Sequence, residues 1–233
     1  MTPAVVLCAV DLGPSTDRVL YHAAGFARLL DAALRIVHVT ADDSADLKAR
    51  VMAQCLAAAP YEAQIDEESI VVAHGRVSEA IQREALRANA VLVIVGSRRH
   101  GGLTRLLIGS TSEALLSLAR TPVLLVPPTD IDIVSVGDHP ALTCGPVLAA
   151  IDLAEVCARQ LQWASRLAGL AAQPLLLMTV ARTKIADHDA AGTIDAALAR
   201  NDRDLVLLHD EGDAGGEAVH GVLLLLQHVL EMD

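Results

Sequence analysis

A glycine-hinged loop with basic side chains is the stretch of this sequence best suited to holding a ligand. The apolar run Val91–Val95 is typical of a strand buried on both faces, and it ends at Gly96. Three more glycines lie in or at the end of the polar loop that follows: Gly101, Gly102 and Gly109. Four basic side chains lie within it: Arg98, Arg99, His100 and Arg105. In a chain of formal net charge -11, this arrangement predicts an anion site; an ordinary connection with solvated arginines is the alternative.

The loop leads into a helix start, which is the second part of an anion site. Ser110 and Glu113 have the spacing of a capping box, and an apolar face follows at Ala114, Leu115, Leu118 and Ala119. Backbone N–H groups in the first turn of a helix lack partners, and the helix dipole adds positive potential there. Phosphate is therefore the expected guest. The Ser110 hydroxyl is interpreted as a helix cap and not as a nucleophile, because no His and Asp partners are placed to activate it.

Apolar runs alternate with amphipathic ones along the first half of the chain. The expected strands are Ala4–Val10, Leu34–Val39, Ile70–Ala73, Val91–Val95 and Val123–Val126. The expected helices are 15–30, 44–59, 78–88 and the one that begins at Ser110 and ends before Pro122. This alternation predicts the α/β class, with an open parallel five-stranded sheet and helices on both faces.

At three places in this region the chain resembles the universal stress protein family. The family loop reads G-x2-G-x9-G-[ST] and is followed by a helix and a Pro-Val-Leu-Val-type strand. Gly96, the pair Gly109-Ser110 and the run Thr121–Leu124 fall in register with that pattern. The second glycine of the pattern falls at Arg99, whose side chain and restricted φ obstruct a close approach of the backbone to phosphates. The resemblance implies the strand order 3-2-1-4-5.

The resemblance also implies an adenine-nucleotide site, ATP or AMP with or without Mg²⁺. The residues that match the adenine side of the family site are Ala9, Val10, Asp11 and Val39. Those that match the ribose and phosphate side are Val95, Gly96, Arg98, Arg99, Gly109, Ser110, Thr111 and Ser112. A carboxylate at Asp11 can accept from the exocyclic amine of adenine, where guanine presents a carbonyl. The alternative for Asp11 is a turn residue before Gly13-Pro14. His38, within a strand beside the adenine position, is interpreted as a packed core histidine rather than as a base.

These features together favour a regulatory or sensor protein with one nucleotide site in the first half, and not a turnover enzyme. Hydrolysis would be slow at most, because no general base is identified. The family often dimerises through the strand equivalent to Val123–Val126, so a homodimer is expected. The alternative is a scaffold or interaction protein of the same fold that binds no nucleotide because Arg99 blocks the loop.

Composition excludes several other classes of function. Aromatic residues are 2% of the chain and the net charge is -11, which disfavours nucleic acid and anionic membrane surfaces as partners. The N-terminal stretch lacks a positively charged region, and the apolar run 221–230 is too short to span a bilayer, so a cytoplasmic location is expected. The cysteines form no CxxC pair and are expected to be reduced and buried: Cys8, Cys55, Cys144 and Cys157.

The sequence lacks the common catalytic signatures. The sequence has no Walker A motif, no dinucleotide-binding GxGxxG after a strand, no HExxH and no GxSxG elbow. Two acidic and histidine pairs could be drawn as a metal site, Asp187-His188-Asp189 and His209-Asp210, but their spacing brings no three ligands together. We therefore predict no catalytic residues and no metal site.

The second half of the chain repeats the first in shortened form. Residues 146–155 repeat residues 5–14, and Asp152 and Val180 answer Asp11 and Val39 at one constant offset. Residues 204–209 then answer Val91–Gly96 at a shorter offset, so this half keeps counterparts of strands two, one and four, followed by an acidic loop and a helix over 217–230. The predicted domains are 1–127, which holds the nucleotide loop, a linker over 128–145, and a degenerate repeat over 146–233.

Overall fold

The computed structural model describes two compact units of the chain. Described are residues 4–60, 63, 65–97, 110–127, 132–150, 158–178, 205–208 and 222–223. The first unit runs up to Ala141 and the second begins at Leu142, within the segment 128–145 expected as a linker. The domain limits given by the sequence otherwise stay a prediction. None of the helices in the described part of the chain is long and apolar enough to span a membrane.

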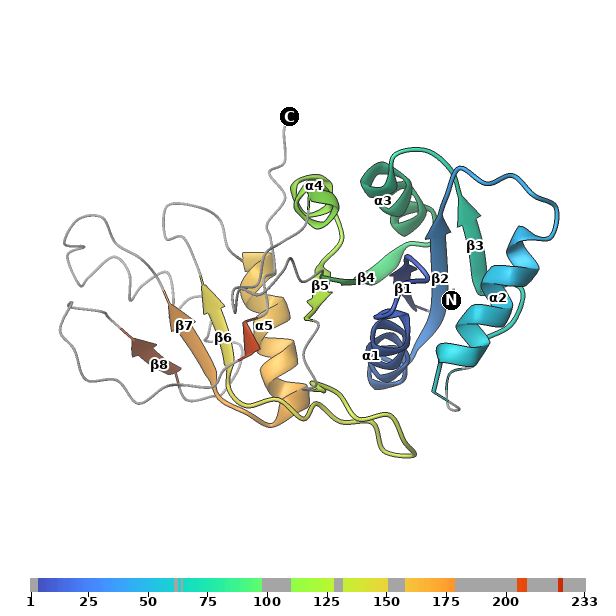
Figure 1. The fold of residues 1–233 in the computed structure, drawn as a ribbon. Coiled ribbons are helices and arrows are strands. Elements are labelled where there is room, and N and C mark those ends of the chain that lie inside the picture. The colour runs from blue at the N-terminus through green and yellow to red at the C-terminus, as the bar shows by residue number, and fades with distance from the viewer. Residues whose placement is uncertain are drawn as a thin grey trace. The chain divides into compact units, whose positions relative to one another are not determined.

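The first unit is built on a parallel sheet with helices on both faces (Figure 1). Its strands are β1 (Ala4–Val10), β2 (Ala32–Val39), β3 (Ile70–Ala73), β4 (Ala90–Gly96) and β5 (Val123–Val126). They are ordered β3-β2-β1-β4-β5, which confirms the expected topology. Its helices are α1 (Thr16–Leu29), α2 (Leu47–Ala58), α3 (Val77–Arg87) and α4 (Ser110–Leu118). The α1–α2 pair and the α3–α4 pair cover opposite faces (Figure 1).

The core of this unit lies on both faces of the central strands. Leu7 of β1 and Val93 of β4 are buried in one cluster with Ile81 and Leu115 of α3 and α4. The neighbours of Leu7 along the strand, Val6 and Cys8, are completely buried too, and the alternation of a strand turns them to the opposite face. Burial on both faces explains why these strands read as unbroken apolar runs.

Helix starts differ from the sequence-based expectations by one or a few residues. The residue before α3 is Arg76, so Ser78, where the expected helix began, lies inside the helix. Ser15 does precede α1, but its side chain makes no capping hydrogen bond. Ser110 is helical and is the first described residue of α4, and the residues before it lie outside the described part of the chain. The buried face of α4 also differs, because Leu116 is buried and Leu118 is exposed.

Residues 132–141, here called the strap, pack against the outer side of α1. Ile133 and Val134 of the strap are 3% and 0% exposed. Gly25 allows this contact, because a Cβ at that position would lie 2.7 Å from Cγ1 of Val134. Arg18 ties the start of the strap to the end of β5: its Nη1 donates to Asp132 Oδ1 at 3.0 Å and its Nε donates to the Pro127 carbonyl at 3.0 Å.

A buried histidine joins the strap to the same helix. His22 is completely buried, its Nδ1 lies 2.8 Å from the Arg18 carbonyl, and the Ile133 N–H lies 3.4 Å from its Nε2. A carbonyl only accepts, so Nδ1 carries the proton, and Nε2 must be unprotonated to accept from Ile133. Both hydrogen bonds therefore need the neutral imidazole.

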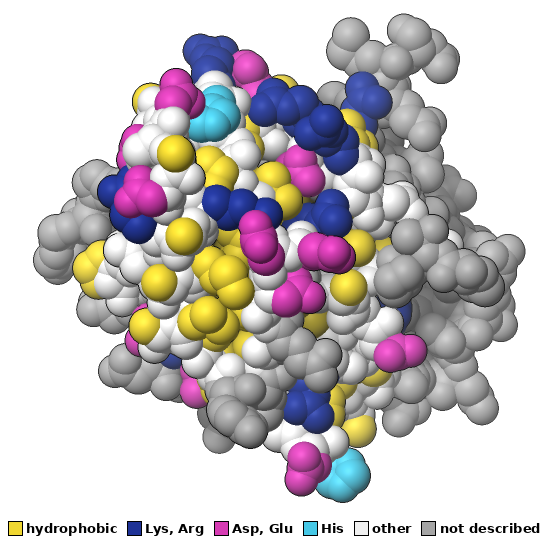
Figure 2. Space-filling model, turned by 90° about the vertical axis from the view of Figure 1, so that its right-hand side faces the viewer, with side chains coloured by type: hydrophobic (Ala, Val, Ile, Leu, Met, Phe, Trp, Pro, Cys, Tyr) yellow, Lys and Arg dark blue, Asp and Glu magenta, His cyan; other side chains and the backbone are white. Residues whose placement is uncertain are grey.

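One face of the first unit shows how its charges are distributed. Acidic and basic side chains lie next to one another, with hydrophobic side chains between them (Figure 2). The ion pairs Lys48–Glu67 at 3.7 Å and Arg76–Glu79 at 3.2 Å join largely exposed groups. Exposed pairs of this kind contribute little to stability, and their mixture of signs creates no strong field of one sign on this face.

The second unit contains a smaller parallel sheet. Its strands are β6 (Val147–Ala150), β7 (Leu175–Met178), β8 (Leu205–Leu208) and β9 (Val222–Leu223), in the order β8-β7-β6-β9. A helix, α5 (Ala158–Ala171), lies between β6 and β7 in the sequence. The acidic loop expected between β8 and β9 lies outside the described residues.

Two expectations for the second unit were wrong. The run 204–209 was expected to act as strand four, beside β6, but β8 pairs with β7, which is the place of strand three. A helix was expected over 217–230, but within that range Val222–Leu223 form the strand β9, which pairs with β6. A short apolar run indicates a buried element, and its periodicity alone settles neither its type nor its neighbour.

The glycine contact under the strap gives a stability prediction. Gly25→Ala should lower the free energy of unfolding by about 1–2 kcal/mol, because overpacking costs about 1–3 kcal/mol and alanine returns up to about 1 kcal/mol of helix propensity. Gly137→Ala is the matched control, since a Cβ there meets nothing within 4 Å. Urea midpoints at an unchanged m-value measure both; equal midpoints for the two variants would contradict the contact.

The histidine under the strap gives a pH prediction. Burial lowers the pKa of His22 from its ordinary value of 6.5, and this effect outweighs the Arg18 carbonyl and Asp132, which raise it. The unfolded chain therefore takes up a proton near pH 6.5 that the folded chain does not. The contribution of neutral His22 to stability is complete above that pH and is lost progressively below it. His22→Gln should flatten the fall in unfolding free energy between pH 7 and 5. The exposed His139, changed to Gln, is the control; equal slopes for wild type and His22→Gln would refute the assignment.

Candidate functional site

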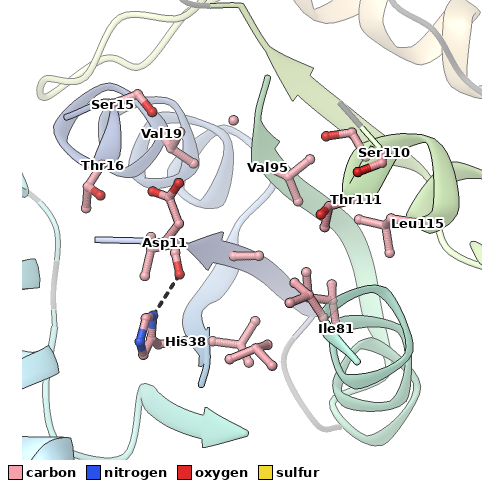
Figure 3. Close-up of a pocket in the computed structure, with 17 residues that line it drawn as sticks. Asp11, Ser15, Thr16, Val19, His38, Ile81, Val95, Ser110, Thr111 and Leu115 are labelled. Atoms are coloured by element: carbon pink, nitrogen blue, oxygen red, sulfur yellow. Dashed lines mark hydrogen bonds between the residues drawn. The ribbon is translucent and has the colours of Figure 1, made fainter. Parts of the chain in front are cut away.

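A cavity of about 320 Å³ lies at the carboxyl ends of β1, β2 and β4 (Figure 3). β1 pairs with β2 on one side and with β4 on the other, so the chain changes direction across the sheet at this point. Ala9 of β1 pairs with Val95 of β4, which places the end of β1 beside Gly96. Open parallel sheets bind ligands at such a point, because the loops on either side diverge and leave a crevice.

Three helices begin at the rim of this cavity. α1 lines it with Ser15, Thr16 and Val19, and α4 lines it from its first residue, Ser110. α3 contributes Val77 and Ile81, which lie one turn apart on the same face of that helix. The first backbone N–H groups of each helix have no partner inside the helix, so this end of the unit is favourable for an anion.

The cavity is apolar at its base and polar at its rim. The base is continuous with the hydrophobic core, since Val37, Ile81, Val95 and Leu115 belong to the buried cluster and also line the cavity. The polar groups at the rim are the Asp11 carboxylate, the His38 ring and the hydroxyls of Ser15, Thr16, Ser110, Thr111 and Ser112. A pocket of this size with a few polar groups suits a small molecule that has a flat apolar part and a polar part.

Asp11 shapes the turn that follows β1. Its Oδ1 accepts the Gly13 N–H at 2.9 Å, which is the turn role expected as the alternative. A carboxylate has two oxygens that each accept more than one hydrogen bond, so this contact does not exclude a second one. The turn fixes the Asp11 side chain at the edge of the cavity (Figure 3).

His38 ties β1 to β2 at the cavity wall. Its Nδ1 lies 3.0 Å from the Val10 carbonyl, so that nitrogen carries the proton and donates (Figure 3). The ring is half-buried, and it lines the cavity while it holds the backbone of the neighbouring strand. This agrees with a packed histidine more than with a base, because one ring nitrogen is committed to the backbone.

Gly96 is required by packing as well as by its place in the loop. A Cβ at this position would lie 3.0 Å from Cγ2 of Val19 and 3.6 Å from Oγ of Ser15. The start of α1 therefore packs closely over the end of β4. This contact brings the first turn of α1 to the loop that begins at Gly96.

Most of the residues expected at the site line this cavity. They are Ala9, Val10, Asp11, Val39, Val95, Gly96, Ser110, Thr111 and Ser112. Arg98, Arg99 and Gly109 lie outside the described residues. The role in binding of all twelve expected residues stays a prediction.

Several other lining residues were missed by sequence reasoning: Ser15, Thr16, Val19, Val37, Val77, Ile81 and Leu115. His38 was considered and judged a packed core residue. The helical spacing of Val77 and Ile81 and the position of Ser15 after Gly13-Pro14 were signals in the sequence, but they did not indicate which cavity these side chains would face.

Thiol and metal chemistry find little support around the site. Burial raises the pKa of the Cys8 thiol and raises that of Cys55 to about 11, so both remain protonated and unreactive at neutral pH. Within the described ranges, no group of three His, Cys, Asp or Glu side chains could hold a metal ion. The pairs Asp187-His188-Asp189 and His209-Asp210 lie outside those ranges.

The fold is that of an α/β protein with a cavity at the point where strand order reverses. Residues 4–127, more than half of the chain, match the universal stress protein family, and the chain belongs to that family.

A universal stress protein of Mycolicibacterium smegmatis is 33% identical over 138 residues, which cover 52% of this chain and 47% of that relative. The match thus spans about half of the relative's length.

Solved structures agree on the fold. A universal stress protein of Archaeoglobus fulgidus is similar to 89% of this chain with a TM-score of 0.58 at 16% identity, and 78% of that protein is covered. A universal stress protein from the same organism was solved in complex with dAMP; it is similar to 54% of this chain, at 20% identity and a TM-score of 0.42, with 98% of that protein covered. At these identities the similarity concerns the fold alone.

The two roles of Asp11 can be separated by substitution. Asp11→Ala should lower the free energy of unfolding by about 1 kcal/mol relative to Asp11→Asn, because Asn keeps an oxygen for the Gly13 N–H and Ala does not. Urea denaturation of the two variants measures the difference. Equal stability would mean that the turn does not depend on this hydrogen bond.

Proposed function

We propose that this protein binds an adenine nucleotide, ATP or AMP, in the cavity at the ends of β1, β2 and β4 and acts as a regulatory or sensor protein. The observation that supports this most strongly is the single cavity lined both by residues that follow β1 and β2 and by the start of α4. Membership of the universal stress protein family supports the same ligand class.

In the proposed complex the base lies over the apolar base of the cavity. Ala9, Val10 and Val39 contact the ring. One carboxylate oxygen of Asp11 accepts from the exocyclic amine; it is either the oxygen that also accepts from Gly13 or the other one. The ribose and phosphates extend toward Gly96 and the N-terminus of α4, where Ser110, Thr111 and Ser112 supply backbone N–H groups and hydroxyls. Gly109, Arg98 and Arg99 complete the phosphate side.

A regulatory role fits the titratable groups better than turnover does. Among the described lining residues, Asp11 and His38 are the two that could act as a base. One oxygen of Asp11 accepts from Gly13, and one nitrogen of His38 donates to Val10. Hydrolysis would therefore be slow at most, and Mg²⁺ would assist binding of ATP rather than serve as a resident metal.

Self-association is a further part of the proposal. β5 lies at the edge of the five-stranded sheet, and within the described residues it pairs with β4 on one side. An edge strand presents unpaired backbone groups that a second copy can extend. We therefore expect a homodimer through Val123–Val126.

Calorimetric titration of the purified full-length chain tests nucleotide binding. ATP and AMP should bind, and GTP should bind about tenfold more weakly or worse, because a carbonyl replaces the amine that faces Asp11. Gly109→Val should abolish binding by blocking the approach of phosphate. Absence of heat with every nucleotide would refute the proposal. Absence of binding that is restored by Arg99→Gly would favour the scaffold alternative, in which Arg99 blocks the loop.

A further inference from the structure

Thr16 stands between the proposed nucleotide cavity and a second hollow. This neighbouring hollow measures about 300 Å³ and lies between the turn after β1 and helix α2. Its lining residues are Leu12, Gly13, Pro14, Thr16, Asp17, Gln54, Ala57 and Ala58. Among the described residues, Thr16 is the one that lines both spaces. Thr16 therefore lies between the two spaces.

The side chain of Thr16 fills space without making a hydrogen bond. The residue is 6% exposed, and its Oγ1 is buried with no partner in the described part of the chain. A buried hydroxyl without a partner contributes nothing to the fold that a methyl group of similar size could not supply. The shape of this side chain, rather than its polarity, is what the surrounding structure uses.

The position of Thr16 matters because of the side of the cavity on which it lies. Thr16 and Asp11 both line the cavity on the side of α1 (Figure 3). In the proposed complex, Asp11 faces the 6-amino group of adenine. A substituent on that nitrogen would have to extend toward Thr16, and beyond Thr16 lies the second hollow, which is partly lined by the apolar residues Leu12, Ala57 and Ala58.

We propose that Thr16 is a specificity-determining residue that closes the nucleotide cavity at the 6-amino edge of the base. It restricts the ligand to adenine with an unsubstituted amine. It also separates the nucleotide cavity from the second hollow, where apolar residues would contact an alkyl group on that amine. Removal of the side chain should join the two spaces and admit N6-alkyl adenosine monophosphates. This inference rests on the proposed adenine-nucleotide function.

Titration of the full chain with AMP and N6-butyl-AMP tests the proposal. A butyl chain is one methylene wide, so it suits the gap that Thr16→Ala leaves. The wild type should bind N6-butyl-AMP about tenfold more weakly than AMP or worse, since a closed apolar wall discriminates by about that factor or more. Thr16→Ala should raise the ratio of the affinity for N6-butyl-AMP to that for AMP by about tenfold.

Two further variants separate the shape of the side chain from its hydroxyl group. Thr16→Val keeps the volume of the side chain and removes the hydroxyl, so it should exclude N6-butyl-AMP as the wild type does. Thr16→Ser keeps the hydroxyl and removes one methyl, so it should give part of the gain seen with Thr16→Ala. Thr16→Ser also serves as the opening variant if Thr16→Ala does not fold, which urea denaturation of each variant will show.

The outcomes that overturn the proposal are distinct from those that overturn the function. Binding of AMP by all variants with continued exclusion of N6-butyl-AMP by Thr16→Ala and Thr16→Ser would refute the partition and leave the nucleotide site intact. Equal affinity of the wild type for both ligands would refute it as well. Absence of AMP binding by the wild type would overturn the proposed function, and the inference with it.

Discussion

The hydrogen-bonded position of β1 between β2 and β4 is the constraint on which the first unit depends. Because all three strands are parallel, their carboxyl ends lie at one edge, and the loops that leave β1 and β4 diverge from there. The pocket is therefore a consequence of strand order. Its apolar base is the part of the core that the diverging loops leave uncovered. Its polar rim is formed in part by the first residues of the helices that follow these strands.

Local signals in the sequence were sufficient to identify the elements of the first unit. Apolar runs such as Ile70–Ala73 match the observed strand, and Pro60 and Pro122 follow the ends of α2 and α4. The same signals did not predict strand pairing in the second unit, where β8 pairs with β7. Strand pairing is determined by tertiary contacts, and a strand of four residues carries little sequence information about its neighbour.

The site was predictable where a motif fixes both residue type and spacing, as at Asp11, Gly96 and Ser110. It was not predictable where a residue reaches the cavity because of the angle at which its helix packs. Ser15 and Val19 line the cavity because α1 packs against Gly96. The presence of a glycine at the end of β4 does not indicate which helix packs over it. Conversely, the Asp11 turn was visible in the sequence, since aspartate two residues before glycine is a familiar turn signal.

The strap carries a practical consequence for anyone who would dissect this protein. The region matched by the family ends at residue 127, yet Ile133 and Val134 cover the glycine face of α1 and Asp132 holds Arg18. A fragment cut at the family boundary would leave that surface bare and apolar, and His22 would lose the N–H of Ile133. The first unit thus extends past the region matched by the family, and a fragment that keeps these contacts has to reach about Ala141.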